Sequence, residues 1–112
     1  MIELQKELTA VPAVGPVNGG DGEMQKAQML KKRLMDMGFT FFRHFDAPDT
    51  SVSAGLRPNF LASLDGIHKT RKICSITHLD IVPPGELNLW SSDPYKAYVK
   101  DNHIFGRGTE DN

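Results

Sequence analysis

The sequence has one cysteine, one tryptophan and no marked excess of charge, because 13 basic side chains stand against 14 acidic ones in 112 residues. A single cysteine, Cys74, cannot form an internal disulfide, which is typical of the reducing cytoplasm. Balanced charge without a basic run argues against nucleic acid or an anionic membrane as a partner. The apolar runs fall far short of the roughly 18 residues that a membrane span needs, and no secretory signal opens the chain.

The size and composition predict one small α/β domain, or a piece of one. A chain of 112 residues with 39% hydrophobic side chains is close to the usual size of a domain. On folding it buries only about 60–65% of its unfolded surface, so its core is thin.

Two amphipathic helices are expected in the first third of the chain. Residues 1–9 place Leu4 and Leu8 one helical turn apart. A Pro- and Gly-rich loop covers residues 11–22, and the second helix starts at Asp21 as N-cap and ends at Gly38. Its spacing predicts an apolar stripe and a charged remainder off that stripe. The stripe comprises Ala27, Leu30, Leu34 and Met37, and the remainder comprises Lys26, Lys31, Lys32 and Arg33.

The rest of the chain reads as short strands joined by loops. Strands are predicted at residues 39–45, 59–64 and 72–78, with loops at 46–58 and 80–94. The third is apolar on both faces, as in a strand buried between layers. A hairpin follows, with strands 95–100 and 103–107 around the turn Asp101-Asn102. This order predicts a mixed α/β sheet with helices packed on it.

Two motifs carry residues capable of chemistry. His78 and Asp80 follow the apolar strand, at the edge where open α/β sheets bind ligands. An imidazole can bind zinc while a nearby carboxylate holds its other N–H group. The second motif runs from Gly106 to Asp111 and ends on acidic oxygens. By itself it is either a solvated acidic turn or a metal-binding loop.

Other polar residues receive structural interpretations. His44 is expected to be a partly buried packing residue, whereas His68 and His103 are expected to be exposed at turns. Cys74 is expected to be an inert core thiol, since its strand holds no basic neighbour that would lower its pKa. Arg107 could either bind an anion or hold its own loop through a structural bond.

Taken in order, four motifs resemble the N-terminal part of the co-catalytic zinc amidohydrolases and exopeptidases. These motifs are His-x-Asp, Val-Pro-Pro-Gly, Trp followed by Asp-Pro-aromatic, and Gly-Arg-Gly-x-x-Asp. The family includes succinyl-diaminopimelate desuccinylase, acetylornithine deacetylase, aminoacylase-1 and the glutamate carboxypeptidases. The upstream loop, helix and GLRPNFLASL segment are also similar, so the resemblance covers essentially the whole chain and implies a zinc-exopeptidase-like catalytic domain.

The resemblance implies roles for three residues. His78 would be a metal ligand, Asp80 the catalytic-site aspartate that orients His78, and Asp111 the carboxylate that bridges two metal ions. Two divalent ions are implied, zinc first, with cobalt and manganese left open. They would activate a water that attacks the amide of an N-acyl amino acid or peptide.

The resemblance also implies that residues 1–112 are the N-terminal portion of the catalytic domain, truncated at the C-terminus. The family's Glu-Glu pair, its remaining ligands and its lid and dimerisation domain lie outside this sequence, so this portion alone is expected to be inactive. The parent protein is expected to be a cytoplasmic enzyme and, as in many members of the family, a homodimer. Two other hypotheses stay open. One is a short non-catalytic binding module of the same fold, and the other is a pseudo-enzyme holding one structural metal.

Overall fold

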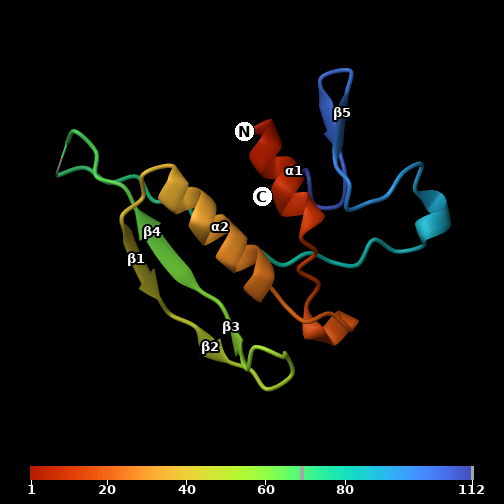
Figure 1. Ribbon diagram of the computed structural model, residues 1–112, viewed down its shortest axis with the longest axis horizontal. Helices are drawn as coiled ribbons and strands as arrows, with labels where there is room; N and C mark the ends of the chain where they lie inside the picture. Colours follow the sequence, from red (N-terminus) through yellow and green to blue (C-terminus); the bar gives the residue numbers. More distant parts are fainter. Residues whose placement is uncertain (69, 112) are drawn as a thin grey trace.

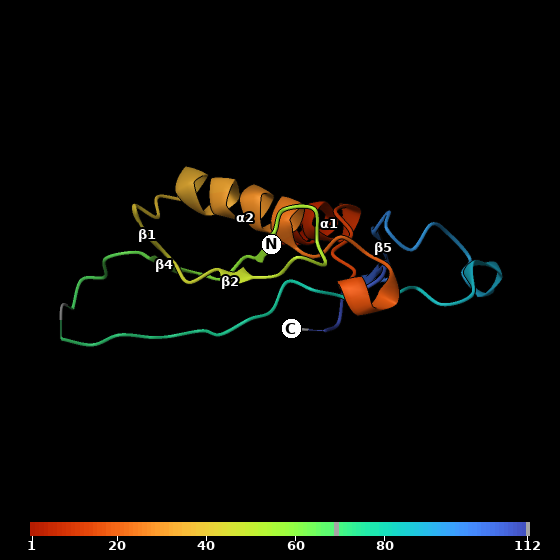
Figure 2. The same cartoon turned by 90° about the horizontal axis from the view of Figure 1, so that it is seen from below.

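Two helices form one side of the molecule in the computed structural model, which describes residues 1–68 and 70–111 (Figure 1). Helix α1 (Ile2–Ala10) and helix α2 (Met24–Asp36) confirm both predicted helices. A 3₁₀ turn, η1 (Pro16–Asn18), lies between them. Seen from below, the helices lie on one side of the strands, and the extended chain after residue 70 lies beyond the strands (Figure 2).

The start of α2 differs from the prediction. Glu23, not Asp21, is the N-cap residue, and it makes no side-chain capping bond. The Asp21 carboxylate instead accepts the backbone N–H of Ser53 at 2.6 Å and the Ser53 hydroxyl. Asp21 therefore ties the loop before α2 to the loop around Ser53. Its carboxylate accepts from the amide and hydroxyl of Ser53, so it does not cap the backbone N–H groups at the start of α2.

The apolar stripe of α2 is only partly confirmed. Ala27 is buried, but Met37 is 61% exposed. Lys26, predicted to lie off the stripe, is buried with 6% exposure. The spacing rule misplaces it because neighbouring segments cover the first turn of the helix, whereas the end of the helix is more open, with Met35 56% exposed.

A long two-part ribbon lies beside α2. Strand β1 (Phe41–His44) pairs antiparallel with β4 (Phe60–Ser63), with His44 opposite Phe60. The short strands β2 (Ala47–Pro48) and β3 (Leu56–Arg57) continue it. Two predicted strands are thus confirmed with shorter bounds, while the predicted loop 46–58 contains a further ladder.

The hairpin near the end of the described chain is also confirmed. Strands β5 (Tyr98–Lys100) and β6 (His103–Phe105) are shorter than predicted. Asp101 and Asn102 have φ of 50° and 60°, the left-handed pair that a two-residue hairpin turn needs. The hairpin lies beside α1 (Figure 1), and the 3₁₀ turn η2 (Leu87–Leu89) precedes it.

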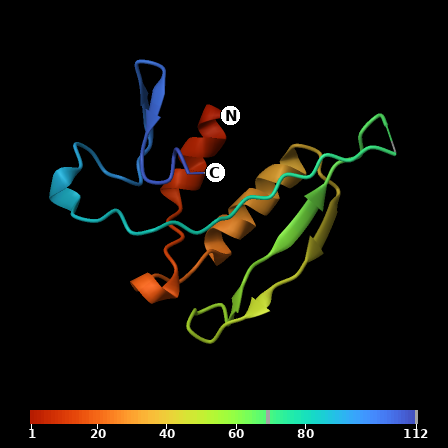
Figure 3. The ribbon, with the colours of Figure 1, turned by 180° about the vertical axis from the view of Figure 1, so that it is seen from behind.

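The predicted strand at residues 72–78 is wrong for the described structure. The segment is extended and crosses α2 on the strand side (Figure 3), but it has no ladder partner among the described residues. Ile73 and Ile76 are 101% and 92% exposed, and Cys74 is exposed rather than in a core. A strand with two apolar faces needs flanking strands and layers to bury it, and the described chain supplies neither.

The predicted mixed sheet is therefore not formed within residues 1–68 and 70–111. The described residues make three two-stranded antiparallel pairs and one isolated parallel bridge, Val14 to Ile81. The fold is small and mixed α/β. Its radius of gyration is 15.8 Å, against about 13 Å for a compact domain of this length.

The core is small, as the length predicts. Ala13, Ala27 and Val52 are its buried apolar residues, and no large side chain is fully buried in the described part. Ion pairs supplement this core. Arg57 donates to Glu23 through Nε at 2.6 Å and also through its terminal nitrogen, and Arg33 binds Glu7 in the same two-pronged way. Among the described residues, no helix is long and apolar enough to cross a membrane.

Candidate metal centre

His78 and Asp80 lie in contact where the extended segment meets the α1 side of the molecule. The His78 Nδ1 atom lies 3.0 Å from the Asp80 carbonyl oxygen and 3.3 Å from Asp80 Oδ1. A carbonyl oxygen only accepts, so Nδ1 carries the proton of this hydrogen bond. In the neutral ring, the lone pair then resides on Nε2, the atom that would bind a metal.

Asp111 meets the other side of the same imidazole ring. Its Oδ2 atom lies 3.6 Å from His78 Nε2. A protonated imidazole would form an ion pair with Asp111 at this distance, whereas a neutral Nε2 and a carboxylate would be two acceptors that one cation could join. Ligands about 2.1 Å from a tetrahedral metal are about 3.4 Å apart, so the imidazole and carboxylate fit a divalent cation in donor type and spacing.

The loop that carries Asp111 is held close to the rest of the centre by backbone contacts. Arg107 Nε donates to the Val82 carbonyl at 3.0 Å, and Gln5 Nε2 donates to the Gly108 carbonyl at 3.3 Å. Of the two roles left open for Arg107, the structural bond is observed. A Cβ on Gly108, whose φ is +75°, would lie 3.1 Å from Ile81. This glycine therefore permits the close approach of the two segments.

The extended segment is anchored where it reaches the centre. The Ile81 N–H donates to the Ala13 carbonyl at 3.0 Å, beside the bridge to Val14. The loop between the helices therefore fixes the chain just after Asp80, although residues 72–78 have no ladder.

A cavity of about 210 Å³ joins these residues. Its lining includes all three predicted site residues and the side chains of Thr77, Lys26 and Arg107. The structure thus brings His78, Asp80 and Asp111 together. No group of three or more His, Cys, Asp or Glu side chains with metal-binding geometry occurs in residues 1–68 and 70–111, so the described chain offers an incomplete ligand set.

Lys26 is the residue of this cavity that sequence reasoning missed. Burial lowers the pKa of its ammonium group, while the negative charges of Asp80 and Glu23 oppose that shift. Arg57 also feels the charge of Asp80, although its own pKa is raised chiefly by the hydrogen bond to Glu23. In the sequence, its one signal is its place directly before Ala27, a residue of the predicted apolar stripe.

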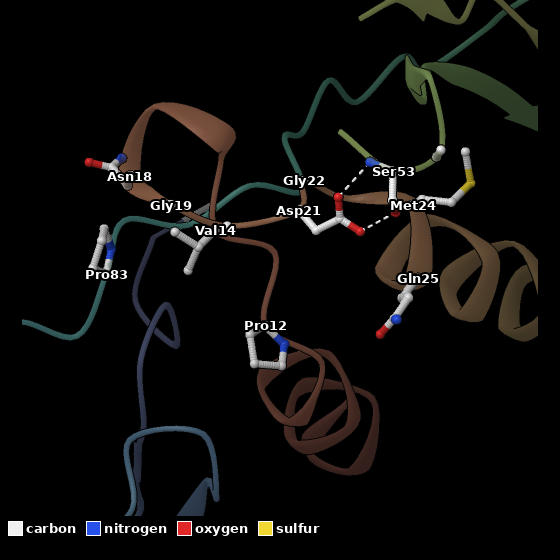
Figure 4. Close-up of a pocket in the computed structure, with 12 residues that line it drawn as sticks. Pro12, Val14, Asn18, Gly19, Asp21, Gly22, Met24, Gln25, Ser53 and Pro83 are labelled. Atoms are coloured by element: carbon white, nitrogen blue, oxygen red, sulfur yellow. Dashed lines mark hydrogen bonds between the residues drawn. The ribbon is translucent and has the colours of Figure 1, made fainter. Parts of the chain in front are cut away.

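A larger cavity of about 570 Å³ lies elsewhere, between the loop before α2 and the loop around Ser53 (Figure 4). Its one carboxylate, Asp21, is already bonded to Ser53. The remaining lining comprises glycines, prolines, aliphatic side chains and amides such as Asn18 and Gln25. This cavity offers no cluster of titratable groups, so the smaller one is the better candidate for chemistry.

The other histidines lie away from this centre. His44 packs against the Phe60 ring at a centroid distance of 6.0 Å but is exposed, so its predicted partial burial is wrong. Its Nε2 accepts from Lys31 Nζ at 2.9 Å. His68 and His103 are exposed as predicted.

Comparison with known proteins shows what the chain is similar to. It is 39% identical to an uncharacterized metallohydrolase of Methanococcus maripaludis over 99% of this chain and 28% of the relative. It is 38% identical to another of Methanocaldococcus jannaschii, again over 99% and 28%. A succinyl-diaminopimelate desuccinylase of Parvibaculum lavamentivorans is 33% identical over 98% of this chain and 25% of its own length.

The chain is therefore homologous to proteins named as metallohydrolases and succinyl-diaminopimelate desuccinylases, which confirms the predicted resemblance. It spans about a quarter of the length of these curated relatives. No protein-family model matches the sequence, and no solved structure matches it significantly.

Proposed function

We propose that this chain contributes to the metal centre of a hydrolase that cleaves the amide bond of N-acyl amino acids or peptides. One observation carries the proposal: Nε2 of His78 and Oδ2 of Asp111 face each other 3.6 Å apart, as two ligands of one cation would. The relatives named as metallohydrolases and desuccinylases point to the same chemistry.

The chain's own residues would share the work as follows. Asp80 holds the Nδ1–H of His78, which fixes the ring and leaves Nε2 for the metal. Asp111 supplies a carboxylate on the opposite side and would bridge two divalent ions, zinc first and cobalt or manganese as alternatives. Such ions, when bound, supply an activated water and polarise a carbonyl oxygen.

The exposed apolar segment favours this proposal over a self-contained binding module. Ile73 and Ile76 are almost fully exposed directly before the centre, whereas an independent domain would bury them. We infer that residues 1–112 form the N-terminal portion of a catalytic domain, with further ligands and a lid and dimerisation domain supplied from outside this portion. Residues 1–112 alone are then expected not to turn over substrate.

The test is hydrolysis of N-acyl amino acids by the full-length protein, measured with added zinc, cobalt or manganese. We expect His78→Ala and Asp111→Ala to lower kcat/KM by more than about 100-fold, beyond the 10–100-fold typical of outer residues such as Asp80. His103→Ala is the matched control, because His103 is exposed and bonded only to its own turn. Near-normal turnover in either site variant would refute the proposal.

A further inference from the structure

Lys26 is a cation whose side chain is largely buried, in a position where burial is costly. It is the third residue of α2 and only 6% exposed. Lysine side chains are almost never fully buried unless they are paired. The position also lies at the positive end of the helix dipole, which disfavours a cation. Within the helix, the negative charge of the N-cap residue Glu23 offsets only part of this cost.

The carboxylates around Lys26 do not pair with it. Glu23, one turn before it, is taken by the two-pronged contact with Arg57, and Arg57 also lies 3.7 Å from Asp49. Across residues 1–68 and 70–111, no hydrogen bond or ion pair reaches the Lys26 ammonium, whose nitrogen keeps contact with solvent. Asp80 attracts it electrostatically without direct contact.

The side chain of Lys26 instead lines the cavity of the candidate metal centre. The same cavity is lined by His78, Asp80, Asp111 and Arg107. Asp80 and Asp111 are the carboxylates of this lining, and Lys26 and Arg107 are its lysine and arginine cations. Arg107 is held to the Val82 carbonyl through its Nε, so Lys26 is the cation without a structural bond.

We propose that the Lys26 ammonium binds a carboxylate of the substrate, in the cavity that it shares with His78 and Asp111. This inference rests on the proposed function of the same cavity. Once Asp111 is engaged with a divalent cation, one of the two carboxylates of this cavity wall is neutralised, while the cations Lys26 and Arg107 remain. A substrate carboxylate would then supply the partner that Lys26 lacks, in a charge-assisted hydrogen bond.

The test compares Lys26→Met, Lys26→Arg and the control Lys32→Met in the full-length protein. Lys32 lies on the same helix but is exposed and paired with Asp36. Three substrates separate the possible carboxylates: an N-succinyl amino acid, its N-butyryl analogue without the acyl carboxylate, and the N-succinyl amino acid amide without the α-carboxylate.

We expect Lys26→Met to raise KM about 10–100-fold for substrates that carry the recognised carboxylate, as for a lost hydrogen bond to a charged group. The KM of the analogue lacking that carboxylate should not change, and kcat should stay within about threefold. Lys26→Arg should restore part of the affinity because it keeps the charge. The analogue that is unaffected identifies which carboxylate Lys26 binds.

An equal loss for all three substrates, or a fall in kcat with KM unchanged, would overturn the proposal and assign Lys26 to positioning Asp80. If the wild type hydrolyses none of the three, the proposed function fails, and succinate binding measured by calorimetry still tests Lys26. A dissociation constant at least about tenfold weaker in Lys26→Met than in Lys32→Met supports the anion site. Equal succinate binding by both variants would overturn it.

Discussion

The ribbon of β1–β4 and the extended segment at residues 72–78 are both rich in apolar residues, yet one is a strand pair and the other is not. In the ribbon, each strand has a partner in the chain, and Phe42 and Phe60 lie 6.3 Å apart at their ring centroids. In the extended segment, Ile73 and Ile76 face solvent. Composition favours a strand, but a partner decides whether it forms.

The two regions also differ in their electrostatic supports. The ribbon is tied to α2 by Arg57 with Glu23, and the loop before α2 is tied to it by Asp21 with Ser53. The extended segment is anchored at Ile81, where it joins the candidate centre. The ribbon is therefore supported from within the chain, whereas the extended segment depends on partners outside it.

The largest change in the free energy of unfolding is expected when a charge is introduced into the supported region, and the same change in the extended segment is its comparison. Val52 is 6% exposed in the supported region, whereas Ile76 is 92% exposed. Val52→Asp should lower the free energy of unfolding of the chain by about 4 kcal/mol, since it removes apolar burial and buries a charge. Ile76→Asp should change it by less than about 0.5 kcal/mol. Urea unfolding measures both, and equal losses would show that the extended segment is packed after all.

Removal of the Arg57 side chain should have the next largest effect. Arg57→Met leaves Glu23 buried and without its partner, so we expect a loss of about 3 kcal/mol in the same urea experiment. The control is Arg43→Met, because Arg43 is exposed and its guanidinium lies over the nearby Phe45 ring, 5.0 Å from its centroid. Indistinguishable unfolding curves for the two variants would show that the Arg57–Glu23 ion pair does not stabilise this region.

Lys26→Met should stabilise the chain, by about 1 kcal/mol at pH 7, because it removes a buried cation with no direct partner. The pKa of Lys26 is lowered in the folded state, so the charged form is penalised at any pH below that folded value. The penalty fades as the pH rises toward the usual lysine pKa of about 10.4. Thermal unfolding at pH 7 and pH 10 should therefore show the advantage of the variant shrinking, and a destabilised variant would contradict this view.

The smallest effect is expected from mild acid. Hydrogen bonds from Arg33, Ser53 and Ser51 lower the pKa values of Glu7, Asp21 and Asp49 respectively. A lowered pKa means that the stability these groups contribute is present above about pH 4, the unfolded value, and lost as pH falls through the folded value. Asp49→Asn should flatten this acid-dependent loss in circular dichroism. A variant whose loss is as steep as the wild type's would rule out that carboxylate.

Local sequence rules predicted the elements whose partners are close in the chain. Both helices, the β1–β4 pair and the Asp101-Asn102 turn follow from periodicity, glycine placement and turn chemistry over short separations. The same rules failed at residues 72–78, because the fate of a strand apolar on both faces is set by neighbours rather than by its own residues. They also failed for Lys26, because helical spacing does not say which segment will cover the first turn.

The candidate centre was predictable as a set of residues, through ordered motifs, but not as an arrangement. The sequence does not show that the Asp80 carbonyl fixes the His78 tautomer, nor that Asp111 returns to within 3.6 Å of Nε2. Both depend on long-range contacts, such as Arg107 with Val82. The anion-binding role proposed for Lys26 has no sequence motif at all.

Zinc affinity is the most direct measurement of the central claim that His78 and Asp111 are ligands of one cation. Calorimetric titration of zinc into the metal-free full-length protein should show at least about 100-fold weaker binding at one site for His78→Ala. The loss for Asp80→Asn should be smaller, because that variant removes the carboxylate charge 3.3 Å from His78 Nδ1 but keeps the backbone carbonyl at 3.0 Å. His44→Ala, which removes a histidine bonded to Lys31 and away from the centre, should bind zinc like the wild type. Unchanged zinc affinity in His78→Ala would contradict the account and leave the His78–Asp111 contact as a simple ion pair.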